Sequence, residues 1–431
     1  MKRKKEIYEK DFGYELLHRF TALCVNLFYR KVECEGQENI PEDGAVIFAP
    51  NHCNAMMDPM AILNTYRGRV VFVARADIFG GVMTKIFEFL KMMPINRRRD
   101  GIRNMVKAEE TIEKSIEVLY NDVPFCILAE GTHRTMHSLL PIGKGIARIA
   151  AGFCEKHPGR KVYIVPVGLE YGDYFRPGST LSVRYGSPVE VSALLGDSEG
   201  GTQLAKMNEI RSLTGEGIKK EIIYLPDDDQ YEPSWELVKV ASGKVPECKP
   251  ALRSEAGRKA ALKLVAFREE NPEGAAALLD EAREFARARR KAGISLHSLS
   301  SRLSALFVVL RSLLAIVLLP VVAVCAVAAS IPLLLAEFLC HFKFKDRAFH
   351  NSARFLIMEL IWPLCFIIGA VVLLICNLPL GIACTLVLWP SPYVVYRYVE
   401  RVRRLVSSWK LQGHKEICRS YDDLLGKMEK I

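Results

Sequence analysis

The sequence predicts an α/β fold, in which a mixed, mostly parallel sheet is flanked by helices and followed by a C-terminal helical membrane region. Two observations predict this fold. Between about residues 46 and 186, short apolar stretches alternate with helical stretches, a pattern typical of a largely buried sheet. Further along, residues 360–396 contain no charged residue, over a length greater than the roughly 20 residues that one membrane crossing needs.

Each expected strand is an apolar stretch bounded by polar or turn residues. The expected strands are 45–49, 70–74, 125–129, 162–169 and 181–186. Helical periodicity predicts helices at 103–120 and 144–154 between them. Because strands and helices alternate, the sequence favours parallel pairing with helical crossovers.

The N-terminal region, 1–34, contains an amphipathic stretch over residues 11–30. At helical spacing, one face carries the apolar residues Phe12, Leu16, Phe20, Leu23 and Leu27. The opposite face carries Glu15, Arg19, Asn26 and Arg30. Such a helix lies on a bilayer surface or packs on the next domain, and the pattern favours neither.

Composition divides the remainder into an α/β domain at 35–195, a helical connector at 196–300 and a membrane region at 301–431. The connector is rich in Ala, Lys and Arg and contains two expected helices, 251–268 and 272–292. Nothing in it indicates chemistry.

The long uncharged run predicts a transmembrane hairpin with crossings at 360–376 and 380–396, joined by the turn sequence CNLPLG. Basic residues flank both ends, which places both ends in the cytoplasm. We therefore expect a protein of the cytoplasmic (inner) membrane, with its α/β domain facing the cytosol. A second uncharged run, 313–336, is interrupted by Pro320 and Pro332, and it is either a crossing or a re-entrant or interfacial helix pair.

The 431 residues carry a formal charge of +10. A basic excess fits nucleic acid, anionic lipid or a phosphorylated substrate. No zinc-finger spacing or RNA-recognition signature is present, so lipid or phosphate is favoured. The 12 cysteines contain no C-x-x-C pair, which indicates reduced thiols.

The strongest candidate chemistry follows the strand at 45–49. His52 lies in the loop after it and Asp58 follows six positions later, immediately before Pro59. Asp58 is predicted to cap a helix at 59–66, and its two oxygens allow it to orient an imidazole as well.

Three further segments carry candidate binding residues. Asn96 and Arg97 begin the run NRRRD, whose guanidinium groups suit phosphate, although such a run is also typical of a solvated face. The turn EGTHRT supplies Glu130, Gly131, Thr132 and Arg134 after a strand. His133 and His137 are four apart, but this spacing alone does not predict zinc. Lys144 begins a helix, and Pro166 lies inside the strand at 162–169.

Taken in order, these four segments resemble the glycerophosphate acyltransferase family, also called the 1-acylglycerol-3-phosphate acyltransferase family. Its blocks are N-H-x4-D, an arginine after a Pro-Ile-like pair, E-G-T-R, and an apolar strand with proline. Here five residues separate His52 from Asp58, and His133 displaces Arg134 by one position. The longer first block and its D-P ending resemble a glycerol-3-phosphate O-acyltransferase-like subgroup that acts on glycerol 3-phosphate or dihydroxyacetone phosphate.

The resemblance implies acyl transfer to a hydroxyl of glycerol 3-phosphate on the route to phosphatidic acid and phospholipid. His52 would be the general base and Asp58 would orient it, with no covalent intermediate, cofactor or metal. Arg97 would bind the substrate phosphate ahead of Arg134 and Lys144. The remaining substrate-binding residues would be Asn51, Asn96, Glu130, Gly131, Thr132 and Pro166. The implied donor is an acyl-acyl-carrier protein or an acyl-CoA.

Other functions stay open. One alternative acceptor is 1-acyl-sn-glycerol-3-phosphate (lysophosphatidate), which the four blocks do not distinguish from glycerol 3-phosphate. A lipid ester hydrolase would use the same histidine and aspartate to activate water, although no G-x-S-x-G elbow is present. A non-catalytic membrane lipid-binding protein is the third alternative. The sequence selects neither the donor, the acyl chain length nor the oligomeric state.

Overall fold

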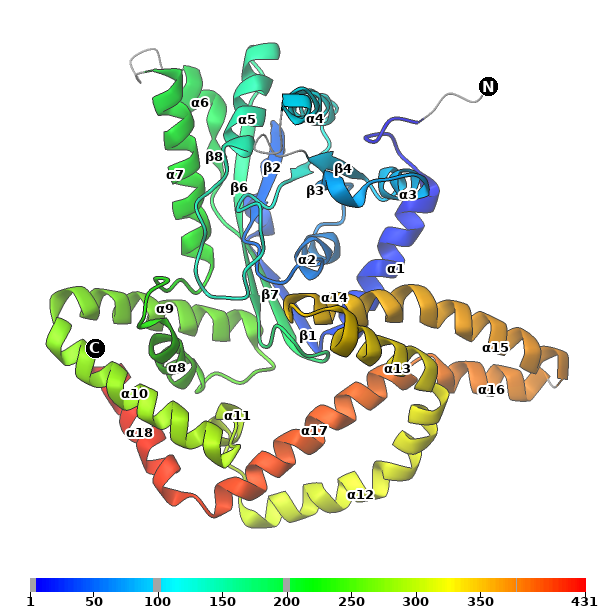
Figure 1. The fold of residues 1–431 in the computed structure, drawn as a ribbon, viewed down its shortest axis with the longest axis vertical. Helices are drawn as coiled ribbons and strands as arrows, with labels where there is room; N and C mark the ends of the chain where they lie inside the picture. The colour runs from blue at the N-terminus through cyan, green and yellow to red at the C-terminus, as the bar shows by residue number, and fades with distance from the viewer. Residues whose placement is uncertain (1–4, 96–101, 197–201, 377) are drawn as a thin grey trace. The chain divides into compact units, whose positions relative to one another are not determined.

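The computed structural model describes residues 5–95, 102–196, 202–376 and 378–431 (Figure 1). The chain forms two compact units. The first comprises Met1–Val25, Glu33–Glu170 and Ser182–Ile222, and the second comprises Asn26–Val32, Tyr171–Leu181 and Ile223–Ile431. The chain therefore passes between the units several times, and the short segments 26–32 and 171–181 belong with the C-terminal helices.

The described strands form one eight-stranded sheet in the order β1-β7-β6-β2-β5-β3-β4, with β8 paired to β6. The strands are β1 Lys31–Glu35, β2 Ala45–Pro50, β3 Val71–Arg75, β4 Met92–Ile95, β5 Phe125–Cys126, β6 Val162–Tyr171, β7 Thr180–Tyr185 and β8 Val189–Glu190. β2 runs parallel to both β5 and β6, and β3 runs parallel to β4 and β5, whereas β8 is antiparallel to β6. The predicted mixed, mostly parallel sheet is confirmed.

The sheet centre is built from β2 and β6, in which every residue is buried. Strands buried on both faces have continuous apolar sequences rather than alternating ones, as AVIFAP and VYIVPVGLEY do. Pro166 lies in the middle of β6 beside Ala49, and its carbonyl accepts a hydrogen bond from the Gly186 N–H. A Cβ at Gly217 would lie 2.5 Å from the Pro166 ring, so this glycine allows close packing of α7 on β6.

The helices of the first unit connect these strands. They are α2 Met57–Thr65, α3 Val82–Phe89, α4 Ile102–Tyr120, α5 Lys144–Lys156, α6 Val191–Gly196 and α7 Gln203–Glu221, with short 3-10 turns η1 Gln37–Asn39 and η2 Ala76–Ile78. α5 packs against both α4 and α7 (Figure 1). The apolar faces of α4 and α5 are predicted by their sequences, whereas α7 is weakly amphipathic and was not expected.

Helix α1, Phe12–Phe28, does not pack through the face that its sequence suggests. Its buried side chains include Tyr14, Cys24, Val25 and Phe28. The expected apolar face points outward instead, with Phe12 81%, Leu16 60% and Leu23 50% exposed. Helix α3 also exposes apolar side chains, namely Val82, Met83, Ile86 and Phe89. The first unit thus has apolar surface on two helices in addition to its core.

The second unit is mostly helical. Its helices are α8 Tyr231–Ser242, α9 Pro250–Glu270, α10 Pro272–Ala292, α11 Leu296–Ser300, α12 Ala305–Ala328, α13 Ser330–Phe338, α14 Ala348–Leu356, α15 Trp362–Cys376, α16 Leu378–Leu388, α17 Ser391–Gln412 and α18 Lys415–Lys430, with π-helical turns η4 Leu339–Lys343 and η5 Ile357–Ile361. α8 packs against α9, α10 and α18. The buried Leu237, Leu264, Phe285 and Tyr421 form the centre of this group.

Two helical stretches of the described chain are long and apolar enough to cross a membrane, Ala305–Ala328 and Ala348–Cys376. α15 and α16 pack against each other as the predicted hairpin (Figure 1). The predicted second crossing, 380–396, is not one helix, because α16 ends at Leu388 and α17 begins at Ser391. Pro390 and Pro392 account for this break, since proline has no N–H to continue a helix. The 11 residues of α16 extend only about 16 Å, and a hydrocarbon core is about 30 Å thick.

Candidate active site

The loop from β2 to α2 brings His52 and Asp58 together. The His52 Nδ1 lies 2.8 Å from the Asp58 Oδ2, and the Asp58 side chain is fully buried while that of His52 is 14% exposed. The predicted cap is wrong in detail, because α2 begins at Met57, one residue before Asp58. Instead of capping a helix that starts after it, the carboxylate accepts hydrogen bonds from the loop that precedes the helix.

Asp58 Oδ2 is an acceptor for several groups. It accepts the Cys53 N–H at 2.9 Å and the Asn54 N–H at 2.8 Å in addition to the imidazole. A carboxylate has only acceptor atoms, so the imidazole donates to it from Nδ1–H. The Nε2 atom then carries the lone pair and is the nitrogen able to take a proton.

The five residues between His52 and Asp58 require an unusual backbone conformation. Ala55 has a φ of +46°, in the left-handed region that residues with a Cβ rarely adopt. Ala55 is also buried. The loop therefore contains local strain of about 1–3 kcal/mol, which the surrounding contacts must offset.

Glu130 holds the backbone of His52. Its Oε1 accepts the His52 N–H at 2.7 Å, and its Oε2 accepts the Leu140 N–H at 2.8 Å. The Arg134 N–H donates to the His52 carbonyl at 3.0 Å, so the 130–140 segment binds His52 on both sides of its Cα. Burial raises the pKa of Glu130, against the opposing effect of the Leu140 and His52 N–H groups. Glu130 thus positions the base through the main chain.

His133 lies beside His52, a neighbour that spacing alone did not reveal. The ring centroids are 5.5 Å apart and the ring planes meet at 69°, an edge-to-face arrangement. Gly131 makes the turn possible with a φ of +71°, and it and Thr132 are exposed beside the imidazole pair. The inserted residue of the EGTHRT segment therefore places a second imidazole at the site.

The rest of this segment is fixed by polar contacts. The Arg134 Nη2 donates to the Ser138 Oγ at 2.6 Å. His137 and Glu170 form a buried pair, with Nδ1 and Oε2 3.2 Å apart, which connects the segment to the end of β6. Among the described residues, no group of three or more His, Cys, Asp or Glu side chains could hold a metal ion.

Other predicted residues lie around the pair. The Asn51 side chain is buried and exchanges two hydrogen bonds with the Leu169 backbone, at 2.7 and 3.2 Å, so it attaches the loop to β6. Pro166 is inside β6, three residues before Leu169. Lys144 is exposed at the first turn of α5, whose cap Gly143 donates to the Ala129 carbonyl. Asn96 and Arg97 lie outside the described residues.

Cys53 is not a nucleophile in this arrangement. Its thiol is buried, with Sγ 3.8 Å from the Asp58 Oδ1 and 3.8 Å from the Leu169 carbonyl oxygen. Burial, together with the Asp58 charge, raises the pKa of the Cys53 thiol well above its usual range. Because the thiolate is the reactive form, the histidine is the chemically competent group here.

Residues 31–170 match the family model described as Acyltransferase, and this range includes His52, Asp58 and the whole EGTHRT segment. The α/β domain belongs to the acyltransferase family. The family that the four sequence blocks resemble is therefore confirmed for this domain.

The acyltransferase domain is similar to two proteins of known activity. Over 65 residues it is 37% identical to glycerol-3-phosphate O-acyltransferase 1 of Saccharomyces cerevisiae, a match that covers 15% of this chain and 9% of the yeast protein. The chain therefore spans only a small part of that relative. Among solved structures, the 1-acyl-sn-glycerophosphate (LPA) acyltransferase PlsC of Thermotoga maritima aligns with 48% of this chain and 78% of its own, at 21% identity and a TM-score of 0.35.

The strain at Ala55 generates a prediction for the loop. We expect Ala55→Val to lower the free energy of unfolding by about 1–3 kcal/mol, since a β-branched residue is more strained at positive φ. Ala55→Gly is the matched control and should be neutral to within about 1 kcal/mol, because glycine adopts this φ freely. Thermal unfolding in detergent tests both, and equal midpoints for Val and Gly would contradict the prediction.

The Glu130 carboxylate generates a pH-dependent prediction. Because the folded pKa is raised, the folded state holds the proton to higher pH than the unfolded chain. The contribution of Glu130 to the free energy of unfolding is therefore greatest at low pH. It decreases as the pH rises from the usual glutamate pKa through the raised pKa of the folded state. Glu130→Gln should abolish that decrease, while leaving one backbone N–H without an acceptor at a pH-independent cost of about 1–3 kcal/mol.

Unfolding midpoints measured across that pH range check the Glu130 prediction. Glu284→Gln, at an exposed glutamate of α10, is the control and should follow the wild type at every pH. Parallel curves for the wild type and Glu130→Gln would show that the proton affinity of Glu130 does not differ between the folded and unfolded states.

Proposed function

We propose that this protein is a membrane-associated O-acyltransferase that transfers a fatty acyl group from an acyl thioester to a hydroxyl of glycerol 3-phosphate. The observation that carries the proposal is the 2.8 Å contact between the His52 Nδ1 and a buried carboxylate, Asp58. This contact leaves the Nε2 lone pair available on a partly exposed ring. A general base with a fixed tautomer is the group that acylation of an alcohol needs.

The chemistry balances without a covalent enzyme intermediate. The His52 Nε2 takes the proton of the substrate hydroxyl as its oxygen attacks the thioester carbonyl carbon. The C–O bond forms, and the C–S bond breaks as the tetrahedral intermediate collapses. The thiolate then receives the proton from His52, so the products are an ester and a free thiol. Asp58 stabilises the imidazolium while it carries the proton.

The substrate phosphate calls for cationic ligands near the base. Arg97, Arg134 and Lys144 are our candidates, since guanidinium and ammonium groups bind phosphate strongly. Thr132, Gly131 and Asn96 would border the glycerol. The acceptor is assigned to glycerol 3-phosphate because the first block has the longer form, and the yeast relative is named for the same reaction. The donor is an acyl-CoA or an acyl-acyl-carrier protein.

A membrane location fits the substrates and the surface. The product lipid and the acyl donor have apolar chains, and the exposed Phe12, Leu16 and Leu23 of α1 supply apolar surface on the domain itself. The basic flanks of the apolar helices favour the cytosolic side of the inner membrane. The same surface would suit lysophosphatidate, whose acyl chain it could cover, so acylation of that lipid is the second candidate function.

Removal of the base should nearly abolish turnover. We expect His52→Ala and Asp58→Asn each to lower kcat by about 10²–10⁴-fold with radiolabelled acyl-CoA, because the first removes the proton acceptor and the second its orienting charge. His414→Ala, at the exposed histidine immediately before α18, is the control and should retain full activity. Full activity of folded His52→Ala would exclude this mechanism, and thioester hydrolysis without an acceptor would favour a hydrolase.

The choice of acceptor is tested separately. Purified protein in phospholipid vesicles receives glycerol 3-phosphate or lysophosphatidate, and the products are separated by thin-layer chromatography. We expect glycerol 3-phosphate to be converted to lysophosphatidate and to be the preferred acceptor. Efficient acylation of lysophosphatidate, with none of glycerol 3-phosphate, would establish the second candidate instead.

A further inference from the structure

Helix α12 has an apolar surface that nothing in the described chain covers. Only Val308, Val322 and Cys325 are buried along its length. Its exposed large apolar side chains are Leu306, Phe307, Val309, Leu310, Leu313, Leu314, Ile316, Val317, Leu319, Val321, Val324 and Val327. A contiguous apolar surface of this extent requires a lipid or protein partner. By length and composition alone, α12 would be assigned as a membrane crossing.

The helix beside α12 is charged. α17 packs along α12, and two hydrogen bonds join it to α12 while a third joins it to Leu303, just before α12 begins. These run from the Tyr398 hydroxyl to the Ala315 carbonyl, from the Trp409 Nε1 to the Ser312 Oγ and from the Gln412 Nε2 to the Leu303 carbonyl, at 2.9, 2.9 and 3.1 Å. Over the same stretch α17 carries the charged residues Arg397, Glu400, Arg401, Arg403, Arg404 and Lys410. The N-terminal half of α12 therefore lies against a helix whose charged side chains require hydration.

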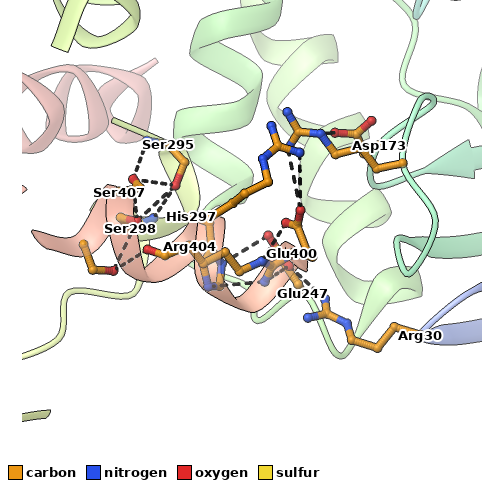
Figure 2. A network of polar contacts seen from close by, with 12 residues as sticks. Arg30, Asp173, Glu247, Ser295, His297, Ser298, Glu400, Arg404 and Ser407 are labelled. Atoms are coloured by element: carbon orange, nitrogen blue, oxygen red, sulfur yellow. Dashed lines mark hydrogen bonds and ion pairs between the residues drawn. The ribbon is translucent and has the colours of Figure 1, made fainter. Parts of the chain in front are cut away.

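A polar network fixes α17 to α11 and to the loop at Glu247 (Figure 2). Arg404 bridges Glu400 and Glu247, at 2.9 and 2.8 Å, and Glu247 also binds Arg30 at 2.8 Å. His297 lies 3.1 Å from the same Glu247 carboxylate. Burial by itself would raise the pKa of Glu247, but His297 and Arg404 hold that pKa well below its usual range. The carboxylate thus remains ionised, and its ion pairs persist at neutral pH.

Serine hydroxyls extend the network toward the end of α17 (Figure 2). The Ser407 Oγ accepts the Ser295 N–H at 2.8 Å and the Ser298 hydroxyl at 2.8 Å. Ser298 and Ser407 are buried, so these bonds do not compete with solvent. α17 is therefore bonded on one face to α11 and the loop at Glu247, and on another face to α12. It has no freedom to rotate its charges away from α12.

This arrangement is incompatible with a crossing by α12. A crossing would place the charged stretch of α17 in hydrocarbon, where each charged side chain costs about 2.5–3.5 kcal/mol at the bilayer centre. We propose that α12 instead lies in the plane of a lipid bilayer interface, with its apolar side in the acyl chains and α17 on its aqueous side. This inference holds whether or not His52 is the catalytic base.

The basic residues of α17 favour a lipid bilayer, rather than a second copy of the chain, as the partner that covers the apolar surface of α12. Arg397, Arg401 and Arg403 are exposed on α17, the helix that packs along α12. Basic residues near anionic headgroups contribute about 1 kcal/mol each, whereas a second copy would bring the same positive charges against these. The neighbouring hairpin of α15 and α16 is apolar on all sides and also needs lipid. Both features indicate one membrane surface.

Spin labels test the depth of α12. A label is attached to p-acetylphenylalanine incorporated at Leu306, Val317 or Val324, which share the exposed face of α12 opposite α17, so that the native cysteines remain. The protein is placed in vesicles of phosphatidylcholine and phosphatidylglycerol, and accessibility to oxygen and to an external nickel complex is measured. We expect all three positions to report a similar shallow depth, within about 5–10 Å of the headgroups, and to be reached from the same side.

Two controls and two contrary outcomes define this test. A label at Ile375, near the end of α15, must be in lipid to show that the protein has inserted, and one at Val399 of α17 should remain closer to water. A label at Val317 near the midplane, about 15 Å deep, with the ends reached from opposite sides, would establish a crossing. Low oxygen accessibility with spin–spin broadening would show that a second copy covers α12. Acyl transfer by each labelled protein is measured separately.

Discussion

The carboxylate of Asp58 is the interaction on which the candidate site depends. Its Oδ2 atom accepts hydrogen bonds from the His52 imidazole and from the Cys53 and Asn54 N–H groups, with no exposure to solvent. One buried anion therefore sets the tautomer of the base, closes the loop and keeps Ala55 in its strained conformation. A buried charge is costly unless it is fully hydrogen-bonded, and this loop is shaped to supply the donors.

Sequence reasoning located the central strands and the histidine–aspartate pair because both leave local signals. The continuous apolar runs of β2 and β6 identify buried strands, and the proline after Asp58 marks a helix start. β1, with its alternating KVECE, and β4, with four residues and a proline, have no such signal. Their strand character comes from pairing with neighbours that are distant in sequence, and propensity alone does not predict such pairing.

The sequence does not predict the roles of Glu130 and Asn51, for a different reason. Both were expected to bind substrate. In the structure Glu130 accepts from main-chain groups of two other segments, and Asn51 binds the Leu169 backbone and the Cys53 thiol. A motif gives the residue type at a spacing, but not whether the side chain faces the cleft or the backbone behind it. The apolar helices illustrate the same point. The hydropathy of α12 is calculated from its own residues and does not include the charged helix α17 that packs against it.

The two departures from the family pattern converge on the same imidazole. The first block has five residues between His52 and Asp58, and Ala55 among them adopts a positive φ. The additional residue in the third block is His133, whose ring lies against His52 from the opposite segment. Glu130 and Arg134 bind the two sides of the His52 backbone between these segments. The base is therefore positioned through its main chain as well as through its ring, and the spacing of the motif alone does not reveal the main-chain part.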